Sequence, residues 1–158
     1  MQKKDFLKLI ISITIPLLAG FVGSYFTTPA IDGWYVELQK PAINPPNWIF
    51  APAWTTLYIL IGIALFLVWR KKDEIKNFLC IVLVFGVQLL LNATWSISFF
   101  GMENPWLGLI NILLLLIAIV FTMVLFFRVS KVAGCLLVPY LLWVTFATYL
   151  NYQILILN

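Results

Sequence analysis

Residues 48–69 read WIFAPAWTTLYILIGIALFLVW, a run without a single charged side chain. A helix needs about 20 apolar residues to cross the hydrocarbon core of a bilayer, and this run is long enough. Similar charge-free stretches cover 9–26, 77–100, 105–127 and 132–157. Only helices or closed barrels satisfy their backbone groups in lipid, and continuous apolar runs lack the alternation of barrel strands. The sequence therefore predicts an all-α membrane protein, a bundle of five transmembrane helices.

The composition excludes a water-soluble globule. Of the 158 residues, 63% are hydrophobic and 10% are charged, and the mean hydropathy is +1.04. Soluble domains carry about 25% charged residues. Five spans with short connections use the whole length, so we expect a single transmembrane domain over 1–158.

The first apolar stretch admits two interpretations. Lysines precede it, as they precede the apolar core of a signal peptide. It also holds two small-xxx-small pairs within 19–24, which suit close packing of helices in lipid. We therefore interpret 9–26 as the first span.

The basic residues predict the orientation of the bundle. Nine of the ten fall on one side of a five-span chain: Lys3, Lys4, Lys8, Arg70, Lys71, Lys72, Lys76, Arg128 and Lys131. Only Lys40 falls on the other side. By the positive-inside rule we expect the N-terminus in the cytoplasm and the C-terminus outside. No Arg- and Ser-rich transit segment is visible, so the plasma membrane of a bacterium is the expected location.

The longest outer connection, 27–47, is rich in proline. Its prolines are Pro29, Pro41, Pro45 and Pro46. Each proline ring fixes one backbone dihedral angle and so stiffens the chain. We expect a structured first loop that caps a pocket at the mouth of the bundle.

Several classes of chemistry are disfavoured by what the sequence lacks. It has no histidine, no acidic or basic residue within any predicted span, and no GxSxG, HExxH or P-loop pattern. Intramembrane charges usually mark ion pathways and proton relays, so an ion-coupled pump is not expected. The two cysteines stand alone in apolar runs, and we expect neither a metal site nor a nucleic-acid partner.

The tryptophans fall into two groups by depth. Three lie near predicted span ends, where an interfacial aromatic belt explains them: Trp48, Trp69 and Trp106. Trp54 and Trp95 lie about 8–9 Å inside the outer ends of their spans, at a rise of about 1.5 Å per residue, and Trp143 lies near the middle of its span. These three rings could either fill space between helices or line one pocket.

Polar residues accompany the deeper tryptophans. Tyr58 follows Trp54 by four positions and shares its helix face, and Asn92, Trp95 and Ser96 share another face. The side chains of such asparagines and serines can form hydrogen bonds between helices. Aromatic walls with a few convergent polar groups also suit a flat, mostly apolar ligand such as a planar macrocycle or a sterol.

Three blocks carry a resemblance to a known family. The first reads WYVELQKP over 34–41 and PPNWIFAPAWTTLY over 45–58, and it continues to Gly62 and Ala64. The second reads QLLLNATWS over 88–96 and ends in FFG over 99–101, and the third reads PYLLW over 139–143 and FATYLN over 146–151. In content and order they resemble the TspO/MBR family, the tryptophan-rich sensory or translocator proteins. The similarity covers nearly the whole chain.

The resemblance implies a five-helix membrane protein, commonly a homodimer, with a pocket roofed by the first loop. Family members bind porphyrins such as protoporphyrin IX, and some bind sterols and benzodiazepine-type drugs; no cofactor is required. The family's ligand-binding positions correspond here to Tyr35, Trp54, Tyr58, Asn92, Trp95, Ser96, Trp143 and Ala147. Lys40 in the loop could pair with a porphyrin propionate.

The resemblance leaves several functions open. The first is a receptor or carrier that binds porphyrin, with a role in tetrapyrrole handling or stress response. Light-dependent breakdown of protoporphyrin IX is an enzymatic alternative, in which Trp54 and Trp143 would be the reacting, catalytic residues. Transport of tetrapyrroles or other apolar ligands is a third. Sterol binding is not expected as a main role, because no basic residue follows Tyr152.

Overall fold

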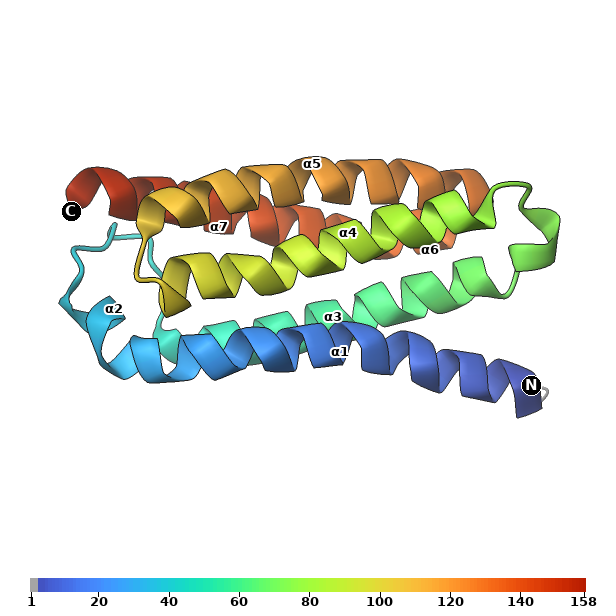
Figure 1. Cartoon of the computed structure of the whole chain (residues 1–158), viewed down its shortest axis with the longest axis horizontal. Helices are drawn as coiled ribbons and strands as arrows, with labels where there is room; N and C mark the ends of the chain where they lie inside the picture. Colours follow the sequence, from blue (N-terminus) through green and yellow to red (C-terminus); the bar gives the residue numbers. More distant parts are fainter. Residues whose placement is uncertain (1–2) are drawn as a thin grey trace.

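The computed structural model describes residues 3–158, and these residues form helices and connecting loops without a strand (Figure 1). The helices are α1 (Lys3–Asp32), α2 (Trp34–Glu37), α3 (Asn47–Trp69), the 3₁₀ turn η1 (Lys72–Glu74), α4 (Phe78–Ser96), the π-helical turn η2 (Ile97–Gly101), α5 (Pro105–Val129), α6 (Lys131–Leu136) and α7 (Val138–Leu157). Five helical segments are long and apolar enough to cross a membrane: Lys4–Asp32, Asn47–Trp69, Phe78–Gly101, Pro105–Val129 and Lys131–Leu157. The predicted five-helix bundle is confirmed.

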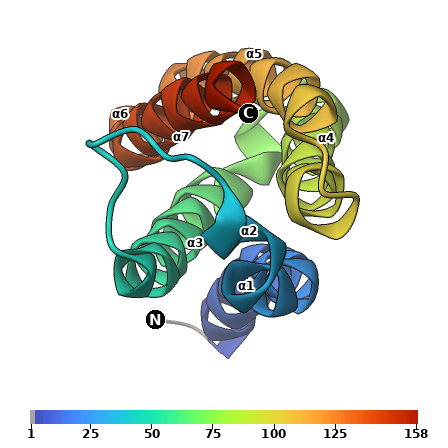
Figure 2. The same cartoon turned by 90° about the vertical axis from the view of Figure 1, so that its left-hand side faces the viewer.

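The spans form a ring, seen end-on in Figure 2. Helix α1 packs against α3 and α4, α4 packs against α5, and α5 packs against α6 and α7. The ring closes mainly where α3 meets α6. Chain neighbours are therefore not always neighbours in the ring, because α1 lies between α3 and α4, the second and third spans.

Apolar side chains fill the half of the ring that lies away from α2. Fully buried residues include Ile61, Val68, Ile112, Ile119, Phe126 and Leu137. The rings of Phe85 and Phe126 stack there with their centroids 5.9 Å apart. This packed half leaves the opposite half of the bundle free to hold a cavity.

Glycines let α1 and α3 approach closely. A Cβ atom on Gly62 would lie 2.6 Å from the Cα atom of Ile13, and one on Gly20 would overlap the ring of Tyr58. Without side chains at these two positions, the helix backbones and the Tyr58 ring can meet directly.

Helix α1 is longer than its predicted span, and the loop is correspondingly shorter. The predicted loop began at residue 27, but α1 continues to Asp32 and includes Pro29. A proline costs one backbone hydrogen bond inside a helix. Packing compensates for it here, because Ala30 is buried and the Phe26 ring lies against Gly101 of η2.

The fifth span is broken rather than continuous. Helix α6 ends at Leu136, and α7 begins at Val138 with Pro139 in its first turn. Proline has no N–H to donate to the preceding turn, so the helical ladder is interrupted at this place. The hydroxyl of Ser130 caps α6 by accepting from the amide of Ala133.

Candidate functional site

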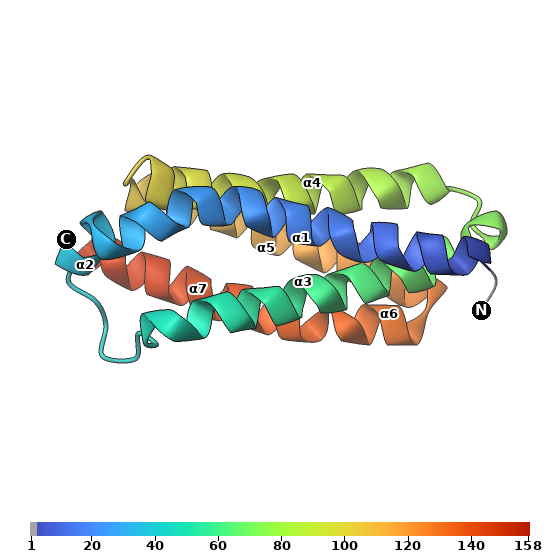
Figure 3. The same cartoon turned by 90° about the horizontal axis from the view of Figure 1, so that it is seen from below.

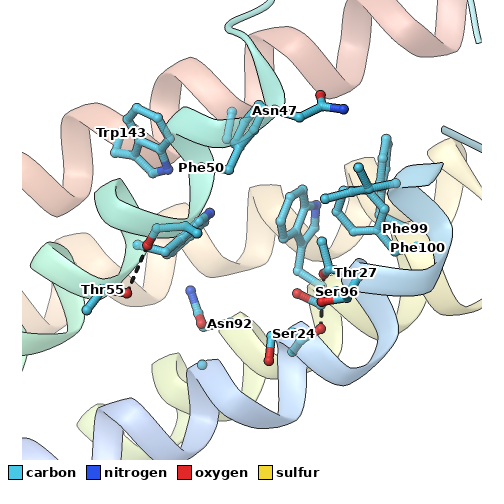
Figure 4. A pocket seen from close by; sticks show the side chains of 18 of the residues that line it. Ser24, Thr27, Asn47, Phe50, Thr55, Asn92, Ser96, Phe99, Phe100 and Trp143 are labelled. Atoms are coloured by element: carbon cyan, nitrogen blue, oxygen red, sulfur yellow. Dashed lines mark hydrogen bonds between the residues drawn. The ribbon is translucent and has the colours of Figure 1, made fainter. Parts of the chain in front are cut away.

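A cavity of about 360 Å³ lies between α1, α3, α4 and α7, beneath α2 and the loop that follows it (Figure 4). It forms where α1 and α3 separate toward the α2 end of the bundle (Figure 3). The structure brings all eight predicted positions to its wall: Tyr35, Trp54, Tyr58, Asn92, Trp95, Ser96, Trp143 and Ala147. Their role toward a ligand stays a prediction.

Trp54 is the centre of an aromatic cluster in this wall. Its ring stacks on Tyr58, with centroids 5.6 Å apart and planes 25° from parallel. The rings of Trp95 and Trp143 lie 6.3 Å and 6.5 Å from it. Three spans thus contribute indoles to one cluster, which presents flat apolar faces to the cavity.

A π-helical turn adds two phenylalanines to this cluster. Trp95 stacks on Phe99 with centroids 5.6 Å apart, and it meets Phe100 edge-on at 5.8 Å. In a regular α-helix, residues five positions apart point about 140° away from each other. Because η2 is wound as a π-helix, Phe100 comes to the same side as Phe99. Neither this turn nor a place for these two residues in the site is predicted from the sequence.

A chain of hydrogen bonds forms the floor of the cavity. The Tyr58 hydroxyl donates to Oδ1 of Asn92 at 2.7 Å, and Nδ2 of Asn92 donates to the Tyr140 hydroxyl at 3.1 Å. These bonds join α3, α4 and α7. Asn92 therefore links helices, as the packing interpretation expects. It also lines the cavity, as the ligand-binding interpretation expects.

Two further asparagines link helices as well. Asn151 accepts from the indole Nε1 of Trp95 at 3.3 Å and donates to the carbonyl of Pro105 at 2.8 Å. Asn111 donates to the hydroxyl of Thr94 at 2.9 Å. Asn151 also lines the cavity, whereas the sequence analysis did not include it in the site.

The indole of Trp143 differs from that of Trp95. Its Nε1 is buried and has no hydrogen-bond partner within residues 3–158. An unpaired buried donor costs free energy unless an acceptor reaches it. The indole N–H of Trp143 is therefore a donor that no described residue uses.

Hydroxyl groups from α1 form a wall that the sequence analysis missed. Ser24, Thr27 and Thr28 all line the cavity, and Figure 4 shows Ser24 and Thr27 near Ser96 of α4. Ser24 was interpreted only as a packing residue, and the two threonines were assigned to the loop. Extending the helical periodicity past residue 26 would have placed them on the same face.

The roof is held by contacts within the loop. Tyr35 is buried and its hydroxyl donates to Oδ1 of Asn44 at 3.0 Å. Burial raises the pKa of the Tyr35 phenol above its usual range, partly offset by the bond with Asn44. The phenol therefore stays protonated and able to donate at neutral pH.

Lys40 is not among the residues that line the cavity. Its ammonium group lies 4.7 Å from the centroid of the Tyr35 ring and donates to the carbonyls of Val36 and Leu38, each at 3.3 Å. These two bonds use two of the three ammonium donors of Lys40, and its pairing with a propionate stays a prediction.

Comparison with known proteins finds one matching family and relatives that cover most of the chain. The chain matches the TspO/MBR family over residues 12–157. It is 50% identical over 161 residues to the tryptophan-rich protein TspO of Chlorobaculum tepidum, covering 99% of both chains. It is 46% identical over 154 residues to the protein of that name in Archaeoglobus fulgidus, covering 98% of this chain and 99% of the relative. It is 39% identical over 138 residues to the human translocator protein, covering 87% and 82%.

Proposed function

Because the chain belongs to the TspO/MBR family, we propose that it binds protoporphyrin IX or a related planar hydrophobic ligand in the aromatic cavity. It is an integral membrane protein with five helical spans. In this proposal it serves as a receptor or carrier in tetrapyrrole handling or in a stress response.

The aromatic cluster around Trp54 is the observation that carries the proposal. Indoles of three spans surround one cavity with flat faces, and no residue that lines it carries a charge. A planar macrocycle gains from stacking and from removal of its apolar area from water. The free Nε1 of Trp143 supports a ligand that carries a hydrogen-bond acceptor. Charged propionates would remain near the roof, outside the uncharged part of the cavity.

A dark titration with protoporphyrin IX, followed by tryptophan fluorescence, tests the proposal. We expect saturable quenching in the wild-type protein. Trp54→Phe should weaken the affinity about fivefold, because a phenyl ring keeps only part of the stacking area of the indole and loses about 1 kcal/mol.

Trp106→Phe is the matched control. Trp106 is 57% exposed and does not line the cavity, so the same change there should leave the affinity unaltered. Equal affinities in the wild type and Trp54→Phe, or quenching that never saturates, would refute the proposal.

Contact between the indoles favours a second candidate, light-dependent breakdown of the porphyrin. In this reaction an excited porphyrin takes one electron from Trp54, and dioxygen accepts that electron from the porphyrin radical anion to become superoxide. The Trp54 radical cation then recovers an electron from the porphyrin, and superoxide adds to the resulting porphyrin radical cation; cleavage of one C–C bond and of the O–O bond opens the macrocycle and leaves two carbonyl groups. Trp143, whose ring centroid lies 6.5 Å from that of Trp54, can share the radical cation with it. Light-dependent product formation that disappears in Trp54→Phe and persists in Trp106→Phe would support this reaction.

The name of the human relative, translocator protein, favours transport as a third candidate. Flux of protoporphyrin IX into sealed proteoliposomes, compared with empty vesicles, would test it. We also propose a homodimer in the plasma membrane of a bacterium, with the N-terminus in the cytoplasm. Support for this orientation comes from the basic residues, which gather at the end of the bundle opposite the roof (Figure 1).

A further inference from the structure

The roof of the cavity is fastened to the end of α7. The amide of Gln39 donates to Oδ1 of Asn158 at 2.9 Å, and Nδ2 of Asn158 donates back to the carbonyl of Gln39 at 3.1 Å. The same Nδ2 also donates to the carbonyl of Ile154, at 2.8 Å. Together with the bond between Tyr35 and Asn44, this clasp ties the roof over the mouth of the cavity.

The seam between α1 and α3 is sealed on the side away from the roof. Gly20 receives the ring of Tyr58, and Gly62 receives the backbone of α1 at Ile13. The Tyr58 ring fills the space between the helices at the first contact, and the backbones approach each other directly at the second. Any opening in this seam must therefore lie between Gly20 and the roof.

The same seam is open near the roof. Ser24 and Thr28 on α1, and Ala51 and Thr55 on α3, line the cavity and are also exposed. Phe21 lines the cavity although 70% of its surface is exposed. By helical periodicity these residues lie on the sides of α1 and α3 that face each other. Figures 2 and 3 show the two helices apart at this end.

This opening lies at the depth of the lipid chains. Ser24 precedes the end of α1 at Asp32 by eight positions, and Thr55 follows the start of α3 at Asn47 by eight positions. At about 1.5 Å per residue, both lie about 12 Å inside the ends of their helices. The hydrocarbon core of a bilayer, about 30 Å thick, would face the opening.

We infer that the cavity has a lateral entrance between α1 and α3, through which an apolar planar ligand enters from the bilayer rather than through the roof. The inference rests on the proposed ligand binding. The rim suits such passage, because two of its three hydroxyl donors are already used. Ser24 donates to the carbonyl of Phe21 and Thr55 to that of Ala51, each at 2.8 Å. Donors that are paired within their own helix do not hold a passing apolar ligand.

Stopped-flow quenching by protoporphyrin IX, with the protein in lipid nanodiscs, tests the entrance. Thr55→Trp places a bulky ring in the opening, so association and dissociation should both slow by about tenfold, because both cross the same barrier. Thr56→Trp is the matched control. Thr56 is exposed, bonds to its own helix as Thr55 does, and does not line the cavity. Its rates should match those of the wild type.

Asn158→Ala tests the roof as the rival route. Loss of the clasp should leave the association rate unchanged if the ligand enters between the helices. Faster association in Asn158→Ala, together with unchanged rates in Thr55→Trp, would overturn the lateral entrance while leaving porphyrin binding intact. Absence of saturable quenching in the wild type would instead refute the proposed function.

If no quenching is seen, a measurement without ligand can still test whether the seam between α1 and α3 is open to lipid. With the exposed Cys80 and Cys135 replaced by serine, a spin label is attached at Ser24→Cys and its collisions with dissolved oxygen are measured in nanodiscs. Tyr25→Cys, on a surface that is 74% exposed, gives the value for open lipid, and Ala30→Cys, 8% exposed, gives the value for a buried site. We expect Ser24→Cys to resemble Tyr25→Cys. A value like that of Ala30→Cys would overturn the entrance whatever the ligand.

Discussion

Asn92 holds three spans together from a single side chain. Its amide accepts from Tyr58 and donates to Tyr140, and all three residues are buried. Tyr58→Phe removes the donor and leaves Oδ1 of Asn92 unpaired. We expect the free energy of unfolding to fall by about 1–2 kcal/mol, since a buried unpaired acceptor costs about that much. Thermal unfolding in detergent measures it.

Tyr25→Phe provides the comparison for this change. Tyr25 is 74% exposed, so loss of its hydroxyl should leave the melting temperature unchanged. Equal melting temperatures for Tyr58→Phe and the wild type would contradict the role assigned to the hydrogen-bond chain.

Gln88 lies one turn deeper than Asn92 on the same face of α4. Its side-chain amide, unlike that of Asn92, has no hydrogen-bond partner among the described residues. It is 1% exposed, and within the described part of the chain neither its Oε1 nor its Nε2 has a hydrogen-bond partner. Replacing an unpaired polar group by an apolar one of similar shape removes its desolvation cost. Gln88→Met should raise the free energy of unfolding by about 1 kcal/mol. A lower melting temperature would show that a water molecule satisfies the amide.

At the level of single residues, the sequence could predict which side chains share a face but not what they bond. The spacing of Trp54 and Tyr58 places them on one side of a helix, and the two rings do stack. The partner of Asn92 is another matter, because Tyr140 lies 48 positions further along the chain. Only the closed ring of spans, in which side chains of α4 and α7 meet in the interior, brings these two groups together.

At the scale of helices, a glycine in the α1–α3 seam and a glycine outside it predict opposite effects of substitution by alanine. A Cβ on Gly62 would lie 2.6 Å from the Ile13 Cα and 2.8 Å from the Ser12 carbonyl oxygen, which are backbone atoms that cannot turn aside. Gly62→Ala should therefore destabilise the fold by about 1–3 kcal/mol. Gly86 on α4 is exposed and has nothing within 4 Å of a built Cβ. Gly86→Ala should instead be neutral or stabilise by up to about 1 kcal/mol through helix propensity.

Unfolding of the two variants under identical detergent conditions makes the comparison. A similar loss of stability in both would mean that the substitution acts on the helices themselves and not on the seam. It would also remove the close approach of α1 and α3 as the reason that the seam is sealed below the cavity.

Helix irregularities limited what the sequence could predict about the elements. Hydropathy locates five apolar runs, because a helix that crosses the bilayer must be long enough to span the hydrocarbon core and must lack charged side chains. It is insensitive to how each run is wound. The π-turn η2, which turns Phe100 toward Trp95, and the break before Pro139 both lie inside runs that are uniformly apolar. The end of α1 at Asp32 is set by packing against η2, which is remote in sequence.

At the scale of the molecule, the order of helices around the ring decides which residues meet. Closure of α3 against α6 leaves α3 and α7 apart near the roof, and this is where the cavity lies. Chain order alone allows several rings of five helices. The resemblance to a family implied a pocket and its positions, whereas the closure that creates the pocket required the structure.

The distribution of charge over the whole molecule gives the last prediction. The connection that contains η1 is basic, and Nζ of Lys71 donates to the carbonyl of Val129, so this end of the bundle is tied to the junction of α5 and α6. Lys40 lies at the opposite end, in the roof. Positive residues are retained on the cytoplasmic side during insertion. In a variant without Cys80 and Cys135, a cysteine at Lys40 should therefore react with a membrane-impermeant maleimide added to intact cells.

The matched reporter is Lys72→Cys in η1, which should react only after the membrane is permeabilised. Both reporters replace a lysine by cysteine, and both positions lie in connections that are exposed or half-exposed. Their intrinsic reactivities toward the maleimide are therefore comparable. Labelling of Lys72→Cys in intact cells, with Lys40→Cys protected, would invert the topology. The cavity roof would then face the cytoplasm, and the lateral entrance would open to the inner leaflet, so that a ligand made inside the cell would reach it without crossing the bilayer.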